Sequence, residues 1–203
     1  MKLLTHSLLS SWLWLLKDEW SEDPMQEFML VLNREPTPTS QAMQDGIDFE
    51  NMVTDIVNGE YDFADDNDPI FRDKWFGAAS EVAYWCKGGI LQHKASKPIT
   101  VNGNNFLLYG RLDCLKGGRI IDIKFSKKYS RGKYYDSTQH PVYMELVPEA
   151  EAFSYLISNG TDVWEETYRR DETRSIYPII IDFVNWLKRM DLYEIYEQKW
   201  STR

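Results

Sequence analysis

Two aspartates and a lysine lie in a pair of short segments whose pattern could serve metal-dependent chemistry. The segments alternate apolar and polar residues on both sides of Gly117-Gly118. A Gly-Gly pair is typical of the two-residue turn of a β-hairpin, because both turn positions need φ > 0. A turn of this length places Asp113 directly opposite Asp122, and Arg111 opposite Lys124.

The predicted pairing of Asp113 with Asp122 is unfavourable unless something lies between them. Directly opposed side chains are about 5 Å apart at Cβ, and like charges at that separation destabilise a sheet. A divalent cation between the carboxylates would turn the repulsion into coordination, and oxygen ligands suit Mg²⁺ or Mn²⁺. Lys124 shares a face with Asp122, so it could stabilise charge on a phosphate beside the metal.

Two alternatives remain open for the hairpin. Its polar face could be an ordinary solvated surface, and a three-residue turn would change the register. The opposite face is predicted to be apolar and carries Leu112, Cys114, Ile121, Ile123 and Phe125.

The composition fits one domain with a sizeable core. The chain has 203 residues, of which 43% are hydrophobic, a length typical of one domain or of one domain with an elaboration. It has no apolar run of the about 18 residues that a membrane span needs, and its apolar start lacks the cleavage site of a signal peptide. Cys86 and Cys114 form no CxxC pair, which argues against a zinc site or a disulfide scaffold and favours a reducing, cytoplasmic setting.

A basic segment lies in a chain whose net charge is −9. Within residues 116–133 the only acidic residue is Asp122, and the cations are Lys116, Arg119, Lys124, Lys127, Lys128, Arg131 and Lys133. For a nucleic-acid binder the distribution of charge matters more than its total. Next to a metal site, the segment is predicted to follow a phosphate backbone; a solvated loop is the alternative.

The remaining sequence predicts helices and strands that could support the hairpin. Helical periodicity occurs over residues 7–20, 25–33, 41–58, 68–86, 137–146 and 176–199. Strands are predicted over residues 90–101, 106–115, 119–125, 153–157 and 163–168. A helix over residues 149–158 is the alternative to the last hairpin. Trp14 widens the apolar stripe of the first helix and is assigned to the core, and the acidic turn at 61–69 is interpreted as a solvated loop.

Glu50 lies at the edge of the apolar face of the predicted helix 41–58. A carboxylate among core residues needs a partner. Glu50 is therefore either a third metal ligand that approaches the hairpin aspartates or a side chain that extends to solvent. Gly46, one turn earlier, could let the helix backbone approach a neighbour closely.

Four motifs follow one another along the chain: Gly46-x-x-x-Glu50, Gly110-Arg-Leu-Asp113, Asp122-Ile-Lys124 and Gln139-x-x-x-Tyr143. Together they resemble the PD-(D/E)xK nuclease superfamily, and the last motif resembles its RecB-type exonuclease branch, which includes phage-type exonucleases and the CRISPR adaptation nucleases. The resemblance covers residues from Thr5 to Tyr168. It implies an α/β (α+β) fold with a restriction-endonuclease-like core, in which helices flank a central mixed β-sheet.

The resemblance also implies roles for individual residues. Glu50, Asp113 and Asp122, with the main-chain carbonyl of Ile123, would bind one or two Mg²⁺ or Mn²⁺ ions. Lys124 would position the attacking water and stabilise the developing charge. Gln139 and Tyr143 would orient the site and contact the DNA strand. Further DNA contacts are expected from Arg111, Lys127, Lys128, Arg131 and Lys133.

The chain departs from the family pattern in two places. Leu112 stands where the name of the motif has proline, a position that the family varies. The four cysteines that bind an iron–sulfur cluster in some RecB-type members are absent, so no cluster is expected. The histidines His6, His93 and His140 show no metal-ligand spacing, and His140 is interpreted either as structural or as a DNA contact.

The predicted function is metal-dependent hydrolysis of DNA, at double-stranded ends or on single strands, that leaves 5′-phosphates. The family habit suggests an exonuclease that acts in phage, recombination or repair processing. One nuclease-like domain spanning 1–203 is expected, with an N-terminal helical part (1–40) and a C-terminal helix (176–203) packed on it. A homo-oligomer and a recombination partner protein are both left open, and no membrane partner is expected.

Two other functional classes remain in view. A nuclease-fold module that no longer cleaves would bind DNA in a salt-sensitive way without hydrolysing it. An accessory protein would use its aromatic C-terminal helix to bind a partner, which requires an exposed apolar face on residues 176–199.

Overall fold

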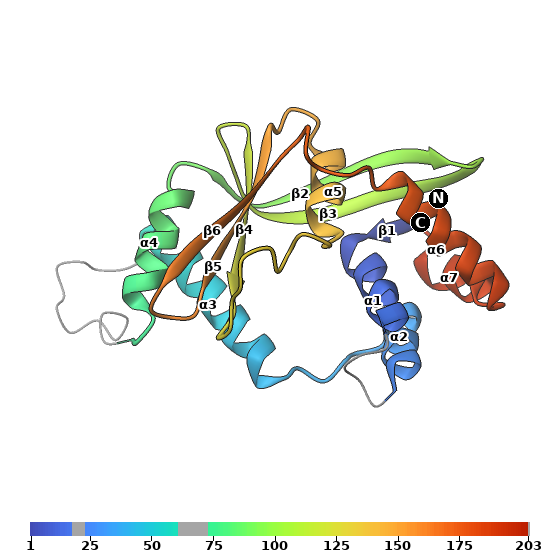
Figure 1. The fold of residues 1–203 in the computed structure, drawn as a ribbon, viewed down its shortest axis with the longest axis horizontal. Helices are drawn as coiled ribbons and strands as arrows, with labels where there is room; N and C mark the ends of the chain where they lie inside the picture. The colour runs from blue at the N-terminus through green and yellow to red at the C-terminus, as the bar shows by residue number, and fades with distance from the viewer. Residues whose placement is uncertain (18–22, 61–72, 203) are drawn as a thin grey trace.

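A mixed six-stranded sheet flanked by helices forms the centre of the protein (Figure 1), which confirms the predicted fold class. The computed structural model describes residues 1–17, 23–60 and 73–202. The strands are β1 (Lys2–Thr5), β2 (Ile90–Val101), β3 (Asn104–Lys116), β4 (Arg119–Phe125), β5 (Ala152–Ser158) and β6 (Val163–Arg169). The helices are α1 (His6–Lys17), α2 (Pro24–Asn33), α3 (Gln41–Asn58), α4 (Phe76–Cys86), α5 (Gln139–Leu146), α6 (Tyr177–Arg189) and α7 (Tyr193–Trp200).

The long strand β3 organises the sheet because it pairs with three other strands. β2 runs antiparallel along one edge of β3. On the other edge, β1 pairs in parallel with residues 106–109, and β4 pairs antiparallel with residues 114–116. β5 pairs in parallel with β4, and β6 is antiparallel to β5. On this edge of β3, residues 110–113 pair with neither β1 nor β4. This unpaired stretch of the edge is the Gly-Arg-Leu-Asp motif.

Helices cover both faces of the sheet and make two separate cores. On one face, Phe49 and Val53 of α3 pack with Ile121 and Ile123 of β4, and α4 completes this smaller core. On the other face, α5 packs on β3 and β5, and the larger core continues under α1, α2, α6 and α7. Ile120 belongs to the larger core, so successive residues of β4 point to opposite faces, as expected for a strand.

The ends of α3 follow from its sequence and match the predicted bounds. The Oγ of Ser40 accepts a hydrogen bond from the Met43 N–H at 3.2 Å, which satisfies one free donor of the first turn. Gly59 ends the helix in the left-handed conformation, with φ of 71°. Residues 34–40 precede the helix, are exposed throughout and carry the chain in an arc from α2 to α3 (Figure 1).

The C-terminal part differs from the prediction of one helix over 176–199. It forms two helices, α6 and α7, because the chain turns at Asp191, whose φ is 57°. Both helices pack on the N-terminal part, where the Tyr196 hydroxyl donates to the Leu3 carbonyl and the Trp200 indole N–H donates to the Leu32 carbonyl, each at 2.8 Å. The apolar face of α6 and α7 is therefore buried, and the accessory-protein hypothesis lacks the exposed face that it requires.

The short strand β1 was not predicted, because four residues are too few to show a period. The helix expected from residue 68 begins at Phe76, and the acidic turn at 61–69 lies outside the described residues. The second hairpin is confirmed as β5 and β6, against the alternative of a helix. None of the described helices has the length and apolar character needed to cross a membrane.

Candidate active site

The hairpin of β3 and β4 has the predicted register over its three described pairs. Cys114 pairs with Ile121, Leu115 with Ile120 and Lys116 with Arg119. The ladder ends at this point, so Asp113 and Asp122 are not a backbone pair, and Arg111 pairs with Lys94 of β2 rather than with Lys124. The Asp113 carboxylate instead accepts a hydrogen bond from the main-chain N–H of Ile123, at 2.8 Å.

The side-chain alternation of β3 is interrupted at Asp113. Leu112 lies in the larger core and Cys114 in the smaller one, although residues two apart on a regular strand share a face. The prediction that both lie on one face is therefore wrong for Leu112. On the neighbouring strand, Gln92 has φ of 51° and makes no regular pair with Asp113. Such an interruption of strand pairing changes the direction of a side chain, and it is common next to functional sites.

Asp122 is the most enclosed member of the site, with 1% of its surface exposed. One carboxylate oxygen, Oδ2, lies 2.7 Å from the ammonium nitrogen of Lys124. The other, Oδ1, accepts a short hydrogen bond from the side-chain amide of Gln139. The prediction that Lys124 shares a face with Asp122 is confirmed. Asp122 Oδ2 is buried, and the Lys124 ammonium group is its one close polar partner among the described residues.

Two other carboxylates, those of Asp122 and Glu50, act on Asp113. Burial raises the pKa of Asp113 well above its ordinary value, and the nearby carboxylates of Asp122 and Glu50 raise it further. Glu50 reaches this position from α3, where its Oε1 accepts a hydrogen bond from the Gln92 side chain at 2.9 Å. The three acids of the predicted site are thus neighbours in space. We call Glu50, Asp113, Asp122 and Lys124 the acid–lysine centre.

Lys124 remains an ammonium group within this centre. Burial acts to lower its pKa, but the carboxylates of Asp122 and Asp113 outweigh that effect and raise the pKa above its ordinary value. On the α1 side, His6 is held neutral, because burial and the charge of Lys124 lower its pKa to about 3. The centre therefore presents one cation whose charge persists across the physiological pH range.

The Gln-x-x-x-Tyr motif lies on α5, directly against the unpaired stretch of the edge of β3. Gln139 orients Asp122, and the Tyr143 hydroxyl donates to the Arg111 carbonyl at 2.9 Å. Both residues are buried, with 5% and 4% of their surface exposed. The expectation that they orient the site therefore has structural support. Their contact with a DNA strand stays a prediction.

Gly110 is required by the Tyr143 ring. A Cβ atom at this position would lie 2.5 Å from Tyr143 Cε1 and 2.9 Å from Leu146 Cδ1. Gly46, by contrast, would have nothing within 4 Å of a Cβ atom. The expected close approach at Gly46 is therefore wrong, and the glycine that allows close packing is the one in the Gly-Arg-Leu-Asp motif.

The ligand atoms of the centre are of the chemical type that binds a hard divalent cation. They are carboxylate oxygens, which Mg²⁺ and Mn²⁺ prefer, and they include a buried oxygen of Asp122 whose one close polar partner among the described residues is Lys124. Among the described residues, however, no group of three or more His, Cys, Asp or Glu side chains is placed to hold a metal ion as it stands. Glu50 is directed to Gln92 and Asp122 to Lys124, so two acids would have to exchange a partner for the ion.

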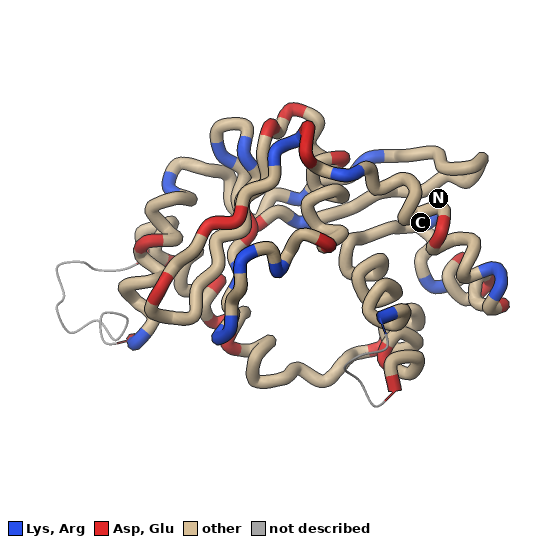
Figure 2. Tube along the Cα trace, viewed as in Figure 1, with Lys and Arg blue, Asp and Glu red and all other residues tan. Residues whose placement is uncertain are grey.

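The loop from residue 126 to residue 138, which joins β4 to α5, carries most of the predicted DNA-binding cations (Figure 2). We call it the basic loop. Lys127 forms an ion pair with Asp45 of α3 at 2.7 Å, and this contact lowers the pKa of Asp45. Lys133 donates to the Ser126 hydroxyl at 2.7 Å. Lys128 and Arg131 are exposed and have no ion-pair partner in the described part of the chain.

Glu166 of β6 holds the basic loop in shape and was not identified from the sequence. It is buried, with 8% of its surface exposed. Its carboxylate accepts the main-chain N–H groups of Gly132 and Tyr134, at 3.1 and 3.2 Å, and the hydroxyls of Tyr129, at 2.7 Å, and Tyr168. Burial alone would raise the pKa of Glu166, but these donors lower it below the ordinary value.

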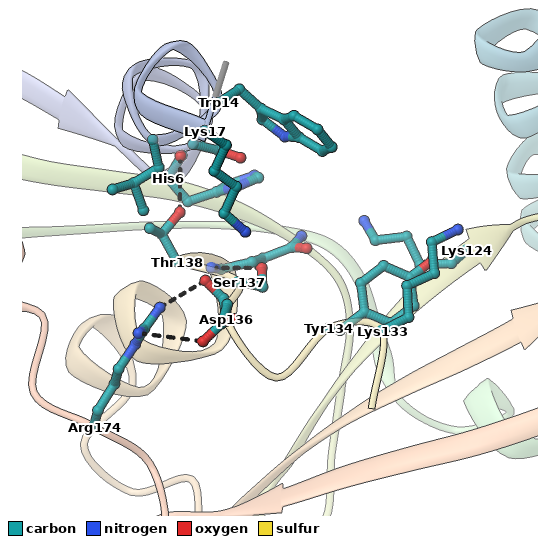
Figure 3. A pocket seen from close by; sticks show the side chains of 13 residues that line it. His6, Trp14, Lys17, Lys124, Lys133, Tyr134, Asp136, Ser137, Thr138 and Arg174 are labelled. Atoms are coloured by element: carbon teal, nitrogen blue, oxygen red, sulfur yellow. Dashed lines mark hydrogen bonds and ion pairs between the residues drawn. The ribbon is translucent and has the colours of Figure 1, made fainter. Parts of the chain in front are cut away.

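A pocket of about 620 Å³ lies between α1 and the basic loop. Figure 3 shows Trp14 and Lys17 of α1 facing Lys133, Tyr134 and Lys124 across it. The remaining lining residues are His6, Ser10, Leu13, Asp136, Ser137, Thr138, Gln139 and Arg174. The pocket thus reaches the two side chains that contact Asp122.

The structure corrects the assignment of Trp14 and confirms the structural interpretation of His140 over the alternative of a DNA contact. Trp14 is not in the core, because 59% of its surface is exposed. His140 is buried, with 2% exposed, and its ring stacks on Tyr168 at 4.2 Å, so it is structural and does not reach DNA. Burial lowers the pKa of His140 to about 4.

Arg111 is exposed, as a DNA contact must be.

Comparison with known proteins informs the fold alone. No model of a known protein family matches the sequence, and no curated protein matches it. Among solved structures, the chain is similar to the one titled "Crystal structure of SSO0001", with a TM-score of 0.53 and 12% sequence identity. The match covers 100% of this chain and 89% of the other. At this identity the likeness supports the mixed α/β architecture and says nothing about activity.

Proposed function

We propose that this protein is a metal-dependent deoxyribonuclease that hydrolyses phosphodiester bonds at the acid–lysine centre. One observation carries the proposal: the buried Asp122 carboxylate lies between Lys124 and Gln139, beside Asp113. A protein that used these residues only for stability would gain little from this arrangement. Replacing a buried ion pair by apolar residues is often neutral or stabilising.

Different side chains of the centre would have different roles in hydrolysis. Lys124 stays charged and would stabilise the negative charge that develops on the phosphate. Gln139 fixes the orientation of Asp122, and Tyr143 fixes the backbone of β3 next to Asp113. Because Lys124 keeps its proton, we assign it electrostatic stabilisation and the positioning of water rather than proton abstraction.

A bound Mg²⁺ or Mn²⁺ would polarise the phosphoryl group and activate a water molecule. Asp113 and Asp122 would hold it, with Glu50 and the main-chain carbonyl of Ile123 as further ligands. Burial raises the pKa of Asp113, and the carboxylates of Asp122 and Glu50 raise it further; such an ion would relieve the repulsion among the three acids.

The proposed substrate is DNA, either as a single strand or as the end of a duplex. Lys17 and Lys133 line the same pocket as Lys124 of the centre, and the basic loop with its free cations begins two residues after Lys124. These cations could contact a phosphate backbone. We further propose that the enzyme removes nucleotides from ends, leaves 5′-phosphates, and works in phage, recombination or repair processing. The free cysteines, Cys86 and Cys114, suit a reducing compartment such as the cytoplasm.

A second candidate is a nuclease-fold module that binds DNA without cleaving it. The observation in its favour is that, over the described residues, no three acidic or histidine side chains are gathered for a metal. This candidate predicts salt-sensitive binding of DNA with no hydrolysis in any metal. The complete set of three acids with Lys124 favours the enzyme.

The two candidates are separated by a hydrolysis assay with linear and covalently closed DNA. The purified protein is expected to degrade linear DNA with Mg²⁺ or Mn²⁺ and not with EDTA. Asp122→Ala should abolish hydrolysis, and Lys124→Gln should lower it by at least about a hundredfold, because it removes a preorganised charge. Asp48→Ala, on the exposed surface of α3, is the matched control and should retain full activity.

Activity that survives Asp122→Ala, or that needs no metal, would reject the enzyme. Thermal unfolding of each variant shows whether a loss of activity reflects a loss of fold. Equal degradation of closed circular and linear DNA would keep the nuclease but remove the assignment as an exonuclease.

A further inference from the structure

Helix α1 has two faces, one buried in the larger core and one that lines the pocket. Leu8, Leu9 and Trp12 are buried in the larger core. A second stripe, spaced along the helix by three or four residues, lines the pocket: His6, Ser10, Leu13, Trp14 and Lys17. The apolar face that the core requires is therefore complete without Trp14.

Trp14 is an exposed tryptophan in the lining of the pocket. Its surface is 59% exposed, and its ring lies at the wall of the pocket (Figure 3). An exposed tryptophan gives up the free energy that its large apolar surface would contribute on burial. Such a ring at a polar pocket is suited to stacking on a flat, aromatic ligand.

The pocket around Trp14 favours a ligand with negative charge. The ammonium group of Lys17 lies 6.0 Å from the centre of the Trp14 ring, and it has no carboxylate partner in the described part of the chain. Lys133 likewise makes its hydrogen bonds to a hydroxyl and a carbonyl. One carboxylate, Asp136, lines the pocket, and Arg174 lies against it at 3.8 Å.

We propose that this pocket is a subsite for an unpaired nucleotide of single-stranded DNA. Trp14 stacks on the base, and Lys17 and Lys133 contact the flanking phosphates. A base in a duplex is already stacked between its neighbours and offers no free face, whereas every base of a single strand does. The proposal rests on the proposed function, because Lys124 and Gln139 connect the pocket to the acid–lysine centre.

The subsite is tested by binding without turnover. Fluorescence anisotropy with a labelled oligothymidylate, in EDTA, measures affinity while hydrolysis is blocked. Trp14→Ala should weaken binding about tenfold, within the range measured for loss of one stacked base, and Trp14→Phe should retain most of the affinity. Lys17→Ala should reduce the slope of log K against log salt by about 0.7, the value for one phosphate contact on a single strand.

Two controls make the result specific. Trp85→Ala removes another exposed tryptophan, on α4 and outside the pocket lining, and should leave binding unchanged. An oligonucleotide of abasic residues retains the phosphates, so its affinity should be the same for the wild type and for Trp14→Ala.

The subsite is overturned if Trp14→Ala binds oligothymidylate as tightly as the wild type, or if it loses affinity equally for the abasic strand. Failure of the subsite and failure of the enzyme are distinguishable. Hydrolysis by the wild type with unaltered binding by Trp14→Ala rejects the subsite alone. Stacking-dependent binding without hydrolysis in any metal rejects the nuclease and retains the subsite.

Discussion

The acid–lysine centre and the basic loop are neighbours that are held in place in different ways. In the centre, every charged group has a partner. Asp122 contacts Lys124 and the buried amide of Gln139, while Asp113 and Glu50 accept hydrogen bonds from protein donors beside them. In the basic loop, Lys128 and Arg131 have no ion-pair partner among the described residues, and the shape of the loop comes from Glu166, on a different strand. All charged groups of the centre are thus held by partners, whereas the loop leaves Lys128 and Arg131 without an ion-pair partner among the described residues.

This difference matches what the two regions are proposed to do. Chemistry at phosphorus requires groups held within a fraction of an ångström, which contacts among the groups themselves can provide. Binding a phosphate backbone requires cations that are not already neutralised. A carboxylate that contacts main-chain N–H groups can shape a loop without consuming its lysines and arginines. We therefore predict that a substitution can disrupt the acid–lysine centre without disrupting the basic loop, and the reverse.

Gly110→Ala should give the largest effect and damage the centre. The new Cβ atom would overlap the Tyr143 ring and displace its hydroxyl from the Arg111 carbonyl. Overpacking costs about 1–3 kcal/mol, and a partly buried carbonyl that loses its partner adds about 1 kcal/mol. We therefore expect a loss of about 3 kcal/mol in the free energy of unfolding, measured by urea denaturation, together with a loss of hydrolysis.

Gly46→Ala is the matched control for this substitution. Position 46 lies inside α3 with nothing within 4 Å of a Cβ atom, and replacing glycine by alanine within a helix stabilises it by about 0.5–1 kcal/mol. If Gly110→Ala is as stable as the wild type, Tyr143 does not constrain β3 in the way described.

Glu166→Gln should have an intermediate effect and damage the basic loop. The amide cannot accept all four hydrogen bonds of the carboxylate, so we expect a loss of about 1–2 kcal/mol and weaker DNA binding. Because the pKa of Glu166 is lowered on folding, its contribution is present above the pKa of glutamate in the unfolded chain, about 4.3. The contribution is lost as the pH falls through the lower pKa of the folded state.

The measurement is urea denaturation of the wild type and Glu166→Gln at pH 7 and below pH 4. The stability difference should shrink at the lower pH. Glu165→Gln, whose carboxylate pairs with the partly exposed Arg119, is the control and should change stability by less than about 1 kcal/mol. A difference between the wild type and Glu166→Gln that does not depend on pH would contradict the role assigned to the carboxylate.

Asp113→Asn should give the smallest change, and it should have the opposite sign. Without metal, the substitution replaces a carboxyl group whose ionisation is disfavoured by burial and by the charges of Asp122 and Glu50, so the variant should unfold at a slightly higher temperature than the wild type. Mn²⁺ should stabilise the wild type, because a ligand that binds only the folded state raises its stability. It should not stabilise Asp113→Asn.

Thermal unfolding with and without Mn²⁺ checks both parts, with Asp48→Asn as a surface control that should behave like the wild type. Stabilisation of the wild type and Asp113→Asn to the same extent would show that the ion binds elsewhere.

Much of the centre could be predicted because local rules determine it. The Gly117-Gly118 turn sets the register of β3 and β4, and the strand period places Lys124 beside Asp122. The interruption at Asp113 could not be predicted, because it accompanies a left-handed conformation at Gln92, a residue type that carries no signal for φ > 0.

Trp14 and Glu166 were missed for another reason. Helical periodicity assigns apolar residues to the inward face, and it cannot tell which of them a functional surface leaves exposed. Three of the four donors to Glu166 lie 32 to 37 residues away along the chain, so the sequence of β6 alone does not reveal its role. Both residues acquire their significance only when α1, β6 and the basic loop come together.

The uninterrupted exposure of residues 34–44 has a consequence for handling the protein. Proteases cut preferentially at exposed, weakly packed chain of this kind. A cut there would release no fragment, because α1 and α2 stay in the larger core with α6 and α7, while α3 stays on the sheet through Phe49 and Val53. The protein should therefore survive as a nicked molecule of two pieces that separate on a denaturing gel and elute together from a sizing column.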